Sequence, residues 1–535
     1  MWEIKRRARL PHGEPLGPES SDAVLTLTGD PGESATSTDP GEAQSWPFGY
    51  IFPKLACDDS KTLAALLEKV NVVEYLKALG DLNTMRDEPD PDNITAVPIP
   101  TAYTFFGQFV DHDITHEITT EKTDLSNAEL KPLSCEEVQG LRNGRSPNLE
   151  LDSVYGSVSG VTPPRDKYNP EKFRIDPVSK PKGLPPGKGE INDLPRGPKT
   201  NDPKTDRVAL IGDIRNDENI ITAQLHVAFL HAHNALIGRG YSFAKARKKL
   251  VQHYQWIVLE DFLPRVADWA VIKKIRTKGP TFFKPSREAL FTPLEFSVAA
   301  YRFGHSKVRD FYVEYNTVLP TAAGLSELFT FTKFSGTLSG DENTHIQGQW
   351  VIDWKNFLRS DKSRFFSRPI DTRLAVALFG LDKEQGQELP DWKKNLAVRN
   401  LLRGYLLRIP TGQAIATTMY EQDQSIVALT PAQIEAAVGE QQYTKMKEAG
   451  FEKAGFHEHT PLWFYILAEA AYYNKGHHLG PVGSTIVAET LIGILRYSDY
   501  SILSTPGWKP TLGSTPGKFD LEDLLELAGV YDPRR

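Results

Sequence analysis

The sequence predicts a mainly α-helical protein with minor β structure. Apolar residues recur at helical spacing in many segments of the 535-residue chain, whereas the apolar–polar alternation typical of a strand is rare. Hydrophobic residues make up 40% of the chain, which is enough to bury a large core and argues against a mainly disordered protein. The chain shows no internal repeat, so a solenoid or propeller is not expected.

The predicted helices follow the apolar pattern in chain order. The first covers 62–82 and is expected to end at Gly80, and a longer one covers 216–237 with Asp217 near its start as a capping residue. The clearest strand candidate is 310–317. Further helices are expected at 244–263, 293–304, 373–379, 431–449, 462–473 and 520–529.

Two stretches lack either pattern. Residues 1–45 are expected to form a flexible polar arm, because 13–45 is rich in Gly, Pro, Ser and Thr. Residues 160–206 are rich in Pro, Gly and Lys and are much longer than an ordinary connection. They are interpreted as a long excursion within a domain that covers 46–535, with an interdomain linker as the alternative.

Targeting signals and membrane spans are not expected. Residues 1–20 hold four basic residues but no apolar stretch after them, so no conventional secretory signal is predicted. The chain is therefore expected in the cytoplasm, or to be exported by an unconventional route. The longest apolar window, 486–495, is too short to cross a bilayer and is interpreted as a core helix.

The charge balance and the cysteine count exclude or disfavour several classes of protein. With 62 Lys+Arg against 69 Asp+Glu, the net charge is −7, which argues against a nucleic-acid binder that neutralises phosphates. Two cysteines, Cys57 and Cys135, allow at most one disulfide and cannot form a thiolate metal cage. We interpret them as small buried apolar residues.

Common phosphate-loop, dinucleotide-binding, zinc-protease and serine-hydrolase motifs are absent, which leaves histidines in polar company within apolar segments. In YTFFGQFVDHDITHE (103–117), a helix would place Gln108, Asp111 and His112 on one face. A buried, hydrogen-bonded histidine is the simpler explanation for this segment alone. A metal site that pairs His112 with His116 is a weaker alternative.

Three later segments add to this one. GDIRNDENIITAQLH holds Arg215 and Glu218 three residues apart, YRFGHS places His305 after a glycine, and RNLLR places Asn400 and Arg403 on one helical face. Each alone suits a salt bridge, a buried histidine or a polar helix edge. Together, two histidines on separate apolar helices, an arginine and an amide are what a buried haem peroxidase site requires.

The strings GQFVDHDIT, GDIRNDEN, YRFGHS and RNLLR also occur in the order and approximate spacing of a known family. The chain resembles the animal-type haem peroxidases of the peroxidase–cyclooxygenase superfamily from about Phe48 to about Leu503. It looks like a bacterial-style member without the disulfides of mammalian relatives. The resemblance implies a single large α-helical domain around one haem b.

The resemblance also implies roles for individual residues. His112 resembles the distal base and Arg215 the distal arginine, while Gln108 lines the distal pocket. His305 resembles the proximal iron ligand, and Asn400 is the residue hydrogen-bonded to its other nitrogen.

Four further residues match positions that hold the haem itself. Arg302 and Arg403 match arginines that contact the haem propionates. Asp111 and Glu218 occupy positions whose carboxylates form ester bonds to haem methyl groups. Asn219 stands where some members have a methionine, so a third covalent bond is not expected.

Calcium is a second implied cofactor. In the family, the Asp after the distal histidine and a loop that ends in Tyr-Gly bind one Ca²⁺, and oxygen ligands of this kind suit that ion. Glu150 stands where an Asp is usual. The implied ligands are Asp113, Ser146, Asn148 through its carbonyl, Glu150 and Asp152.

The expected activity is reduction of H₂O₂ with oxidation of halides, thiocyanate, phenols or other small reductants. A fatty-acid dioxygenase of the same superfamily is one alternative, but its radical-forming tyrosine lies three residues before the proximal histidine, where this chain has Arg302 and only a neighbouring Tyr301. A non-catalytic haem- and calcium-binding adhesion protein is another, although it would need neither His112 nor Arg215. The sequence makes no prediction of oligomeric state.

Overall fold

The computed structural model describes most of the chain from Ser45 onward, and every structural statement below concerns those residues. The expected arm falls outside them, apart from Ser45. The described ranges are 45–66, 70–82, 98–119, 123, 125, 130–156, 162–181, 191–201, 205–332, 345–381 and 391–533.

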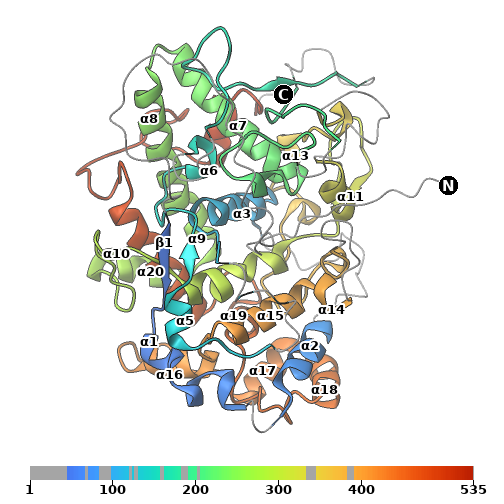
Figure 1. Ribbon diagram of the computed structural model, residues 1–535, viewed down its shortest axis with the longest axis vertical. Coiled ribbons are helices and arrows are strands. Elements are labelled where there is room, and N and C mark those ends of the chain that lie inside the picture. Colours follow the sequence, from blue (N-terminus) through green and yellow to red (C-terminus); the bar gives the residue numbers. More distant parts are fainter. Residues whose placement is uncertain are drawn as a thin grey trace, which may run out of the picture.

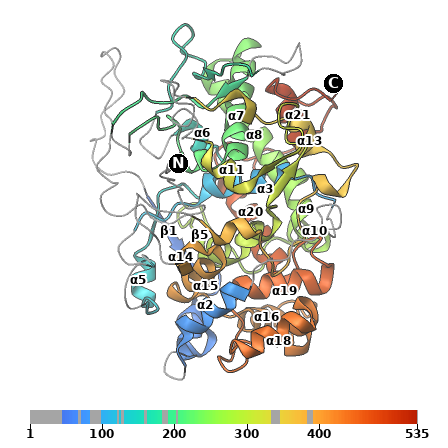
Figure 2. The same ribbon diagram turned by 90° about the vertical axis from the view of Figure 1, so that its right-hand side faces the viewer.

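Helices make up most of the regular structure, as the sequence predicts (Figure 1). In both views α3 (Ala102–Ile114) lies near the centre, with α7 (Ile220–Gly238) above it and α15 (Leu396–Leu406) and α19 (Leu462–Asn474) below (Figure 2). The other α-helices are α1 Pro53–Ala56, α2 Val72–Leu82, α5 Cys135–Gln139, α6 Asp152–Tyr155, α8 Phe243–Trp256, α9 Leu263–Val266, α10 Trp269–Lys278, α11 Leu325–Thr330, α13 Trp354–Leu358, α14 Asp391–Lys394, α16 Gly412–Tyr420, α17 Pro431–Val438, α18 Glu440–Glu448, α20 Pro481–Tyr497 and α21 Leu521–Leu527.

Short 3-10 or π-helical segments, labelled η, connect several of these helices. Two of them replace the predicted helix 293–304: a π-helical η7 (Glu295–Ala299) runs into a 3-10 η8 (Ala300–Lys307). Such segments are frequent where a functional residue sits in a helix. The others are η2 Asp59–Lys61, η3 Leu63–Leu66, η5 Ile214–Asp217, η6 Ile257–Phe262, η9 Gly348–Trp350, η10 Ser363–Phe365 and η11 Val376–Phe379.

The described strands are two to four residues long and form three small sheets. β1 (Trp46–Gly49) pairs antiparallel with β2 (Arg142–Asn143) and parallel with β5 (Thr292–Pro293). β3 (Asp176–Pro177) pairs with β4 (Asn192–Asp193), and β6 (Phe311–Val313) pairs with β7 (Ala322–Gly324), both antiparallel. β6 falls within the predicted strand 310–317.

Glycines explain where two predicted helices differ from the structure. The segment 62–82 divides into η3 and α2, and α2 continues past Gly80 to Leu82. A Cβ at Gly80 would lie 2.5 Å from the Val398 side chain, so this glycine allows α2 to pack closely on α15 rather than ending the helix. The predicted helix 431–449 breaks at Gly439, whose φ of 88° places it in the left-handed region.

Helix α7 begins at Ile220, four residues after the predicted start at 216. Asn219 caps it by accepting a hydrogen bond from the Thr222 amide at 2.9 Å, so the prediction of Asp217 as the capping residue was wrong. Asp217 instead binds Arg196. Among the described helices, α7 alone has the length and apolarity of a membrane span, and 83% of that stretch is buried inside the molecule.

The described part of 160–206 forms hydrogen bonds with α7 and with η5, the turn that precedes it. Arg196 is fully buried and donates to Asp193 and to both carboxylate oxygens of Asp217, at 2.8 and 2.9 Å. Gln224 of α7 donates to the Asn192 carbonyl at 2.9 Å. These contacts agree with an excursion that folds back onto the helices, although the domain limits themselves stay a prediction.

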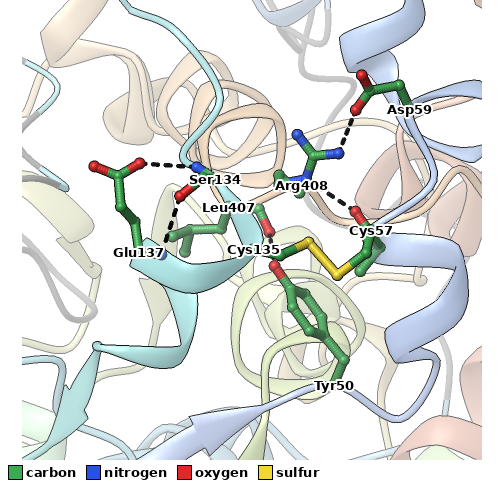
Figure 3. Close-up of a disulfide and its surroundings, with 9 residues drawn as sticks. Tyr50, Cys57, Asp59, Ser134, Cys135, Glu137, Leu407 and Arg408 are labelled. Carbon is green, nitrogen blue, oxygen red and sulfur yellow. Dashed lines mark hydrogen bonds and ion pairs between the residues drawn. A yellow bond between two sulfur atoms is a disulfide. The ribbon is translucent and has the colours of Figure 1, made fainter.

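Cys57 and Cys135 form a disulfide, so their interpretation as small buried residues was wrong (Figure 3). Cys57 is exposed and Cys135 is only half-buried, which removes the basis of that interpretation. Their Cα atoms are 5.8 Å apart, and the bond joins the end of α1 to the start of α5. The resemblance implied a member without the disulfides of mammalian relatives, whereas the structure contains this cross-link of its own.

Candidate functional site

The central helix α3 carries the first predicted site segment. His112 and Asp113 are fully buried, whereas Gln108 and Asp111 are half-buried on the adjoining face. Almost every other residue of α3 is buried and apolar, including Phe105, so the helix is fixed from several sides. The three polar side chains of one face therefore hold defined positions, as their spacing predicts.

A turn that follows the 160–206 excursion brings Arg215 against the end of α3. Arg215 Nη2 donates to the carbonyl oxygens of His112 at 3.1 Å and Thr115 at 2.5 Å. The last carbonyls of a helix have no partners within the helix, so this guanidinium satisfies groups that α3 leaves unpaired. Arg215 is thereby held next to His112, more than 100 residues away in the sequence.

Asp213 holds Arg215 from the other side. Its carboxylate accepts from Arg215 Nη2 at 2.6 Å and from Arg145 Nε at 2.9 Å. Burial alone would raise the pKa of Asp213, but the two guanidinium groups hold it well below its ordinary value. Burial likewise opposes the charge of Arg215, and Asp213 raises the pKa of that guanidinium above its usual value. Both groups are therefore charged at any physiological pH.

Two further residues of the same turn contact α3. Asn216 Oδ1 lies 2.9 Å from His112 Nδ1. Asn219 Nδ2 donates to Gln108 Oε1 at 3.1 Å, and Thr222 donates to the same oxygen at 3.1 Å. The Gln108 amide therefore turns its oxygen toward these donors. The structure thus brings Gln108, His112 and Arg215 close together, and their roles stay predictions.

The second histidine lies on η8, which packs against α3. His305 is buried, and its Nδ1 lies 2.8 Å from Asn400 Nδ2 of α15. Asn400 Oδ1 accepts from Arg302 Nη1 at 3.1 Å, so these three predicted residues form one hydrogen-bonded chain. Tyr301 places its hydroxyl oxygen 3.9 Å from the position that a Cβ on Gly107 would take, which shows how closely η8 approaches α3.

Arg403 is buried one turn after Asn400 and forms an ion pair with Glu117, Nη2 to Oε2, at 2.9 Å. Its Nε and Nη1 atoms, and Nη1 of Arg215, are buried and have no hydrogen-bond partner among the described residues. Three cationic N–H groups thus lack acceptors. Buried groups of this kind are expensive unless something else binds them.

The predicted calcium residues meet at the end of α3. The Asp113 carboxylate accepts from the backbone amides of Leu151 at 3.1 Å and Ser153 at 3.2 Å, and the Ser146 hydroxyl donates to Glu150. Burial raises the pKa of Asp113 to about 7, and the nearby negative charge of Asp152 adds to this shift. The side-chain oxygen of Asn148 is buried without a partner among the described residues.

A complete metal site is not formed by these side chains as they stand. Among the described residues, no group of three or more His, Cys, Asp or Glu side chains is arranged to hold a metal. Asp152 accepts from Arg145 Nη1 at 2.9 Å, so a guanidinium already neutralises one of the predicted ligands. His116 belongs to the alternative metal pair with His112. The residue is half-buried, and the loss of hydration around its ring lowers its pKa to about 3.

Comparison with known proteins finds a peroxidase family model and a peroxidase fold that resemble this chain. The model of the animal haem peroxidase family matches residues 135–334, a stretch that holds Arg215 and His305. Peroxidase A from Dictyostelium discoideum has the same fold, with a TM-score of 0.56 at 13% identity over 85% of this chain and 89% of that one. Residues 135–334 are therefore similar to the animal haem peroxidases, and the chain shares the fold of a peroxidase. The mainly α, single-domain fold predicted from the sequence is thereby confirmed.

Two further proteins are similar to this chain over part of their length or at a lower TM-score. A peroxidase-like protein of Margaritifera margaritifera is 28% identical over 249 residues, which is 39% of this chain and 31% of that protein. The chain thus spans less than a third of this curated relative. The fatty acid alpha-dioxygenase of Oryza sativa has a TM-score of 0.48 at 12% identity, over 85% of this chain and 76% of that one.

The sequence did not predict several residues of this site. Asp213 and Arg145 hold Arg215, and Asn216 contacts His112. A signal existed for Asp213, since an Asp at the start of a short turn is a common cap, and it accepts from the Arg215 amide at 2.9 Å. No pattern in the sequence singles out Arg145 or Asn216.

Proposed function

We propose that this protein is a haem peroxidase that reduces H₂O₂ and oxidises a small reductant such as a halide, thiocyanate or a phenol. The observation that carries the proposal is the hydrogen bond from Arg215 to the backbone carbonyl of His112, because it fixes a permanent cation to the residue that bears the buried imidazole. Cleavage of a peroxide needs a base for its proton and a positive charge for the oxygen that leaves. His112 and Arg215 supply both.

Two features support haem as the cofactor. The buried N–H groups of Arg215 and Arg403 that lack acceptors suit an anionic or polar partner. A Cβ at Gly304 or Gly404 would meet nothing within 4 Å, although the adjoining His305 and Arg403 are buried. Open space beside both residues suits a large planar group, and the superfamily's animal peroxidase members bind haem.

The distal group, which consists of Gln108, His112 and Arg215, has a separate task for each of its residues. A haem held by His305 would supply a redox-active iron for breaking the O–O bond. His112 accepts a proton from the peroxide at Nε2 and returns it to the departing oxygen, so that water leaves. Arg215 stabilises the negative charge that develops on that oxygen. Gln108, whose amide is fixed by Asn219, lines the same pocket and would contact a halide.

The proximal group sets the character of the iron ligand. An iron-binding His305 must offer a bare Nε2, which places its proton on Nδ1. In this structure Asn400 turns its Nδ2 toward His305 Nδ1 and its oxygen toward Arg302, so the amide would have to reverse to accept that proton. A neutral partner would leave the imidazole less anionic than a carboxylate would. Arg302 and Arg403 are assigned to the two propionates.

Covalent attachment is a further part of the proposal. Asp111 and Glu218 flank His112 and Arg215 in the sequence and would form ester bonds to haem methyl groups. Asp111 is half-buried on the face that adjoins Gln108. Asn219 cannot form the third bond that a methionine would supply.

Calcium is proposed at the end of α3. The raised pKa of Asp113 reflects its burial first and the nearby negative charge of Asp152 second, and a cation would favour the charged form of both carboxylates. Oxygen donors of this kind suit Ca²⁺, although Asp152 would have to share its carboxylate with Arg145. The proposed ligands are Asp113, Ser146, Asn148, Glu150 and Asp152.

The test is the reaction of the haem-loaded protein with H₂O₂, followed through its Soret band. We expect rapid conversion that His112→Ala slows by about 100-fold or more. His233→Phe is the matched control, since His233 is an equally buried histidine of α7 that contacts Tyr155 rather than the distal group. Equal loss in both variants would remove His112 from its assigned role. Acid–butanone extraction tests the ester bonds, because free haem in the organic layer would refute them.

Fatty-acid dioxygenation is the second candidate. The hydroxyl of Tyr301 is buried on η8 beside α3, without a hydrogen-bond partner among the described residues. A tyrosine in this position could be oxidised, although it lies one residue from the expected spacing. Oxygen uptake with linoleate in the absence of peroxidase turnover would favour this candidate, and the absence of both reactions would favour a non-catalytic haem-binding protein.

A further inference from the structure

A single side-chain amide joins the proposed base to a second buried histidine. Asn216 Oδ1 lies 2.9 Å from His112 Nδ1, and Asn216 Nδ2 lies 3.0 Å from His226 Nδ1. All three residues are less than 1% exposed. Both contacts are therefore shielded from bulk water.

The chemistry of an amide constrains both rings. Its oxygen only accepts a hydrogen bond and its NH₂ group only donates. With the oxygen toward His112, that ring must carry a proton on Nδ1, and its Nε2 is bare when the ring is neutral. With the amide reversed, Nδ1 of His112 would be bare and Nε2 would carry the proton. Only the first arrangement leaves Nε2 unprotonated and thus able to accept a proton from a peroxide.

The same arrangement tolerates the charged form of only one of the two histidines. When His112 gains a proton at Nε2, its Nδ1–H still donates to the amide oxygen, so the contact survives. A protonated His226 would instead direct an N–H against the NH₂ group. Burial lowers the pKa of His226 to about 3, which keeps that ring neutral and able to accept.

We propose that Asn216 and His226 are positioning residues that hold His112 in the tautomer with a proton on Nδ1 and a bare Nε2. The inference rests on the proposed peroxidase function, in which Nε2 of His112 takes the proton. His226 lies on α7 and fixes the direction of the amide, and the amide fixes the proton of His112. The sequence contains no pattern that indicates this pair.

The test uses binding of cyanide to the ferric, haem-loaded protein. Hydrogen cyanide loses its proton as it binds, so the association rate reports the base without any turnover. Asn216→Leu should slow association by about tenfold or more, since the Nδ1 proton then loses its acceptor. His226→Phe keeps a ring beside Phe109 but removes the acceptor for the amide, and should slow association by about fivefold or more.

Two variants separate this role from a general loss of structure. Asn216→Asp retains an oxygen toward His112 and should keep association within about threefold of the wild type. His233→Phe removes another buried histidine of α7 and should lower stability without slowing association. A purely structural role would instead slow association in both His226→Phe and His233→Phe, and that result would overturn the proposal.

The positive control distinguishes failure of this inference from failure of the proposed function. His112→Leu should slow cyanide association by about 100-fold or more. If it does not, His112 is not the base, and the proposed function fails. If it does, but Asn216→Leu and His226→Phe associate as fast as the wild type, the positioning role alone is refuted. Should Asn216→Leu fail to bind haem, His226→Phe and Asn216→Asp decide the question.

Discussion

The disulfide gives a prediction whose size follows from the structure. Replacing both cysteines, Cys57→Ser with Cys135→Ser, removes the cross-link without leaving a reactive thiol. The two ends stay close in the folded state through other contacts, since Arg408 Nε donates to the Ala56 carbonyl and the Leu133 amide donates to the Leu406 carbonyl, both at 2.9 Å. Most of the effect should therefore arise in the unfolded chain.

The magnitude comes from the entropy of closing a loop. The cysteines are 78 residues apart, and in the chain-entropy treatment a loop of that length stabilises the folded state by about 4.5 kcal/mol. The folded double variant retains its local contacts, so we expect its free energy of unfolding to fall by about 2–4 kcal/mol. The dependence on urea should become steeper, because an unfolded chain without the bond exposes more surface.

Urea unfolding with and without a phosphine reductant measures this directly. The reductant should shift the unfolding midpoint of the wild type and leave that of the double variant unchanged, which provides an internal control. Mass analysis of alkylated peptides should find neither cysteine free in the untreated wild type. A double variant within about 1 kcal/mol of the wild type, with the bond shown to be present, would refute the argument from loop entropy.

Three further predictions concern buried groups. Asp213→Asn removes the carboxylate shared by the buried Arg145 and Arg215, so urea unfolding should show a loss of about 3 kcal/mol or more. Because the pKa of Asp213 is depressed, its contribution to stability is present above about pH 4 and is lost as the pH falls. Wild-type and variant stabilities that fail to converge in acid would contradict this. Burial raises the pKa of Glu469 to about 8, so the wild type should lose stability as the pH rises toward 8, by at most about 1.4 kcal/mol per pH unit. Stability measured from pH 5 to 9 should show a flatter slope in Glu469→Gln. A Cβ at Gly412 would lie 2.0 Å from the Tyr465 ring, so Gly412→Ala should lower the free energy of unfolding by about 1–3 kcal/mol. A Cβ at Gly238 would meet nothing within 4 Å, so Gly238→Ala should leave the free energy of unfolding unchanged by overpacking.

Local chemistry explains which parts of the site the sequence could predict. Gln108 and His112 are separated by four residues on one helix, and Asn400 and Arg403 by three on another, so each pair shares a face whatever the rest of the chain does. The structure places each pair as that spacing requires. The contact between His305 and Asn400, by contrast, joins residues that are 95 positions apart, so helical spacing could not predict it. It was expected only from the family resemblance.

Long-range partners explain most of what the sequence could not predict. Gly80 was interpreted as a helix end because glycine commonly ends helices, yet it is needed where α2 contacts Val398. The cysteines were interpreted from their number alone. Their pairing depends on long-range contacts, in which Arg408 binds the Ala56 carbonyl and Leu133 binds the Leu406 carbonyl. The π and 3-10 geometry of 295–307 also leaves no mark in the apolar pattern, which a regular helix would share.

The turn η5 shows why the distal group depends on distant parts of the chain. In a 3-10 helix successive residues lie about 120° apart, so Arg215, Asn216 and Asp217 point in three directions. Arg215 binds the end of α3, Asn216 binds the two buried histidines, and Asp217 binds Arg196. A turn of four residues has little stability of its own, so these three anchors determine its position. The 160–206 excursion, which supplies Arg196, therefore contributes to the placement of the distal arginine even though it lies outside every motif.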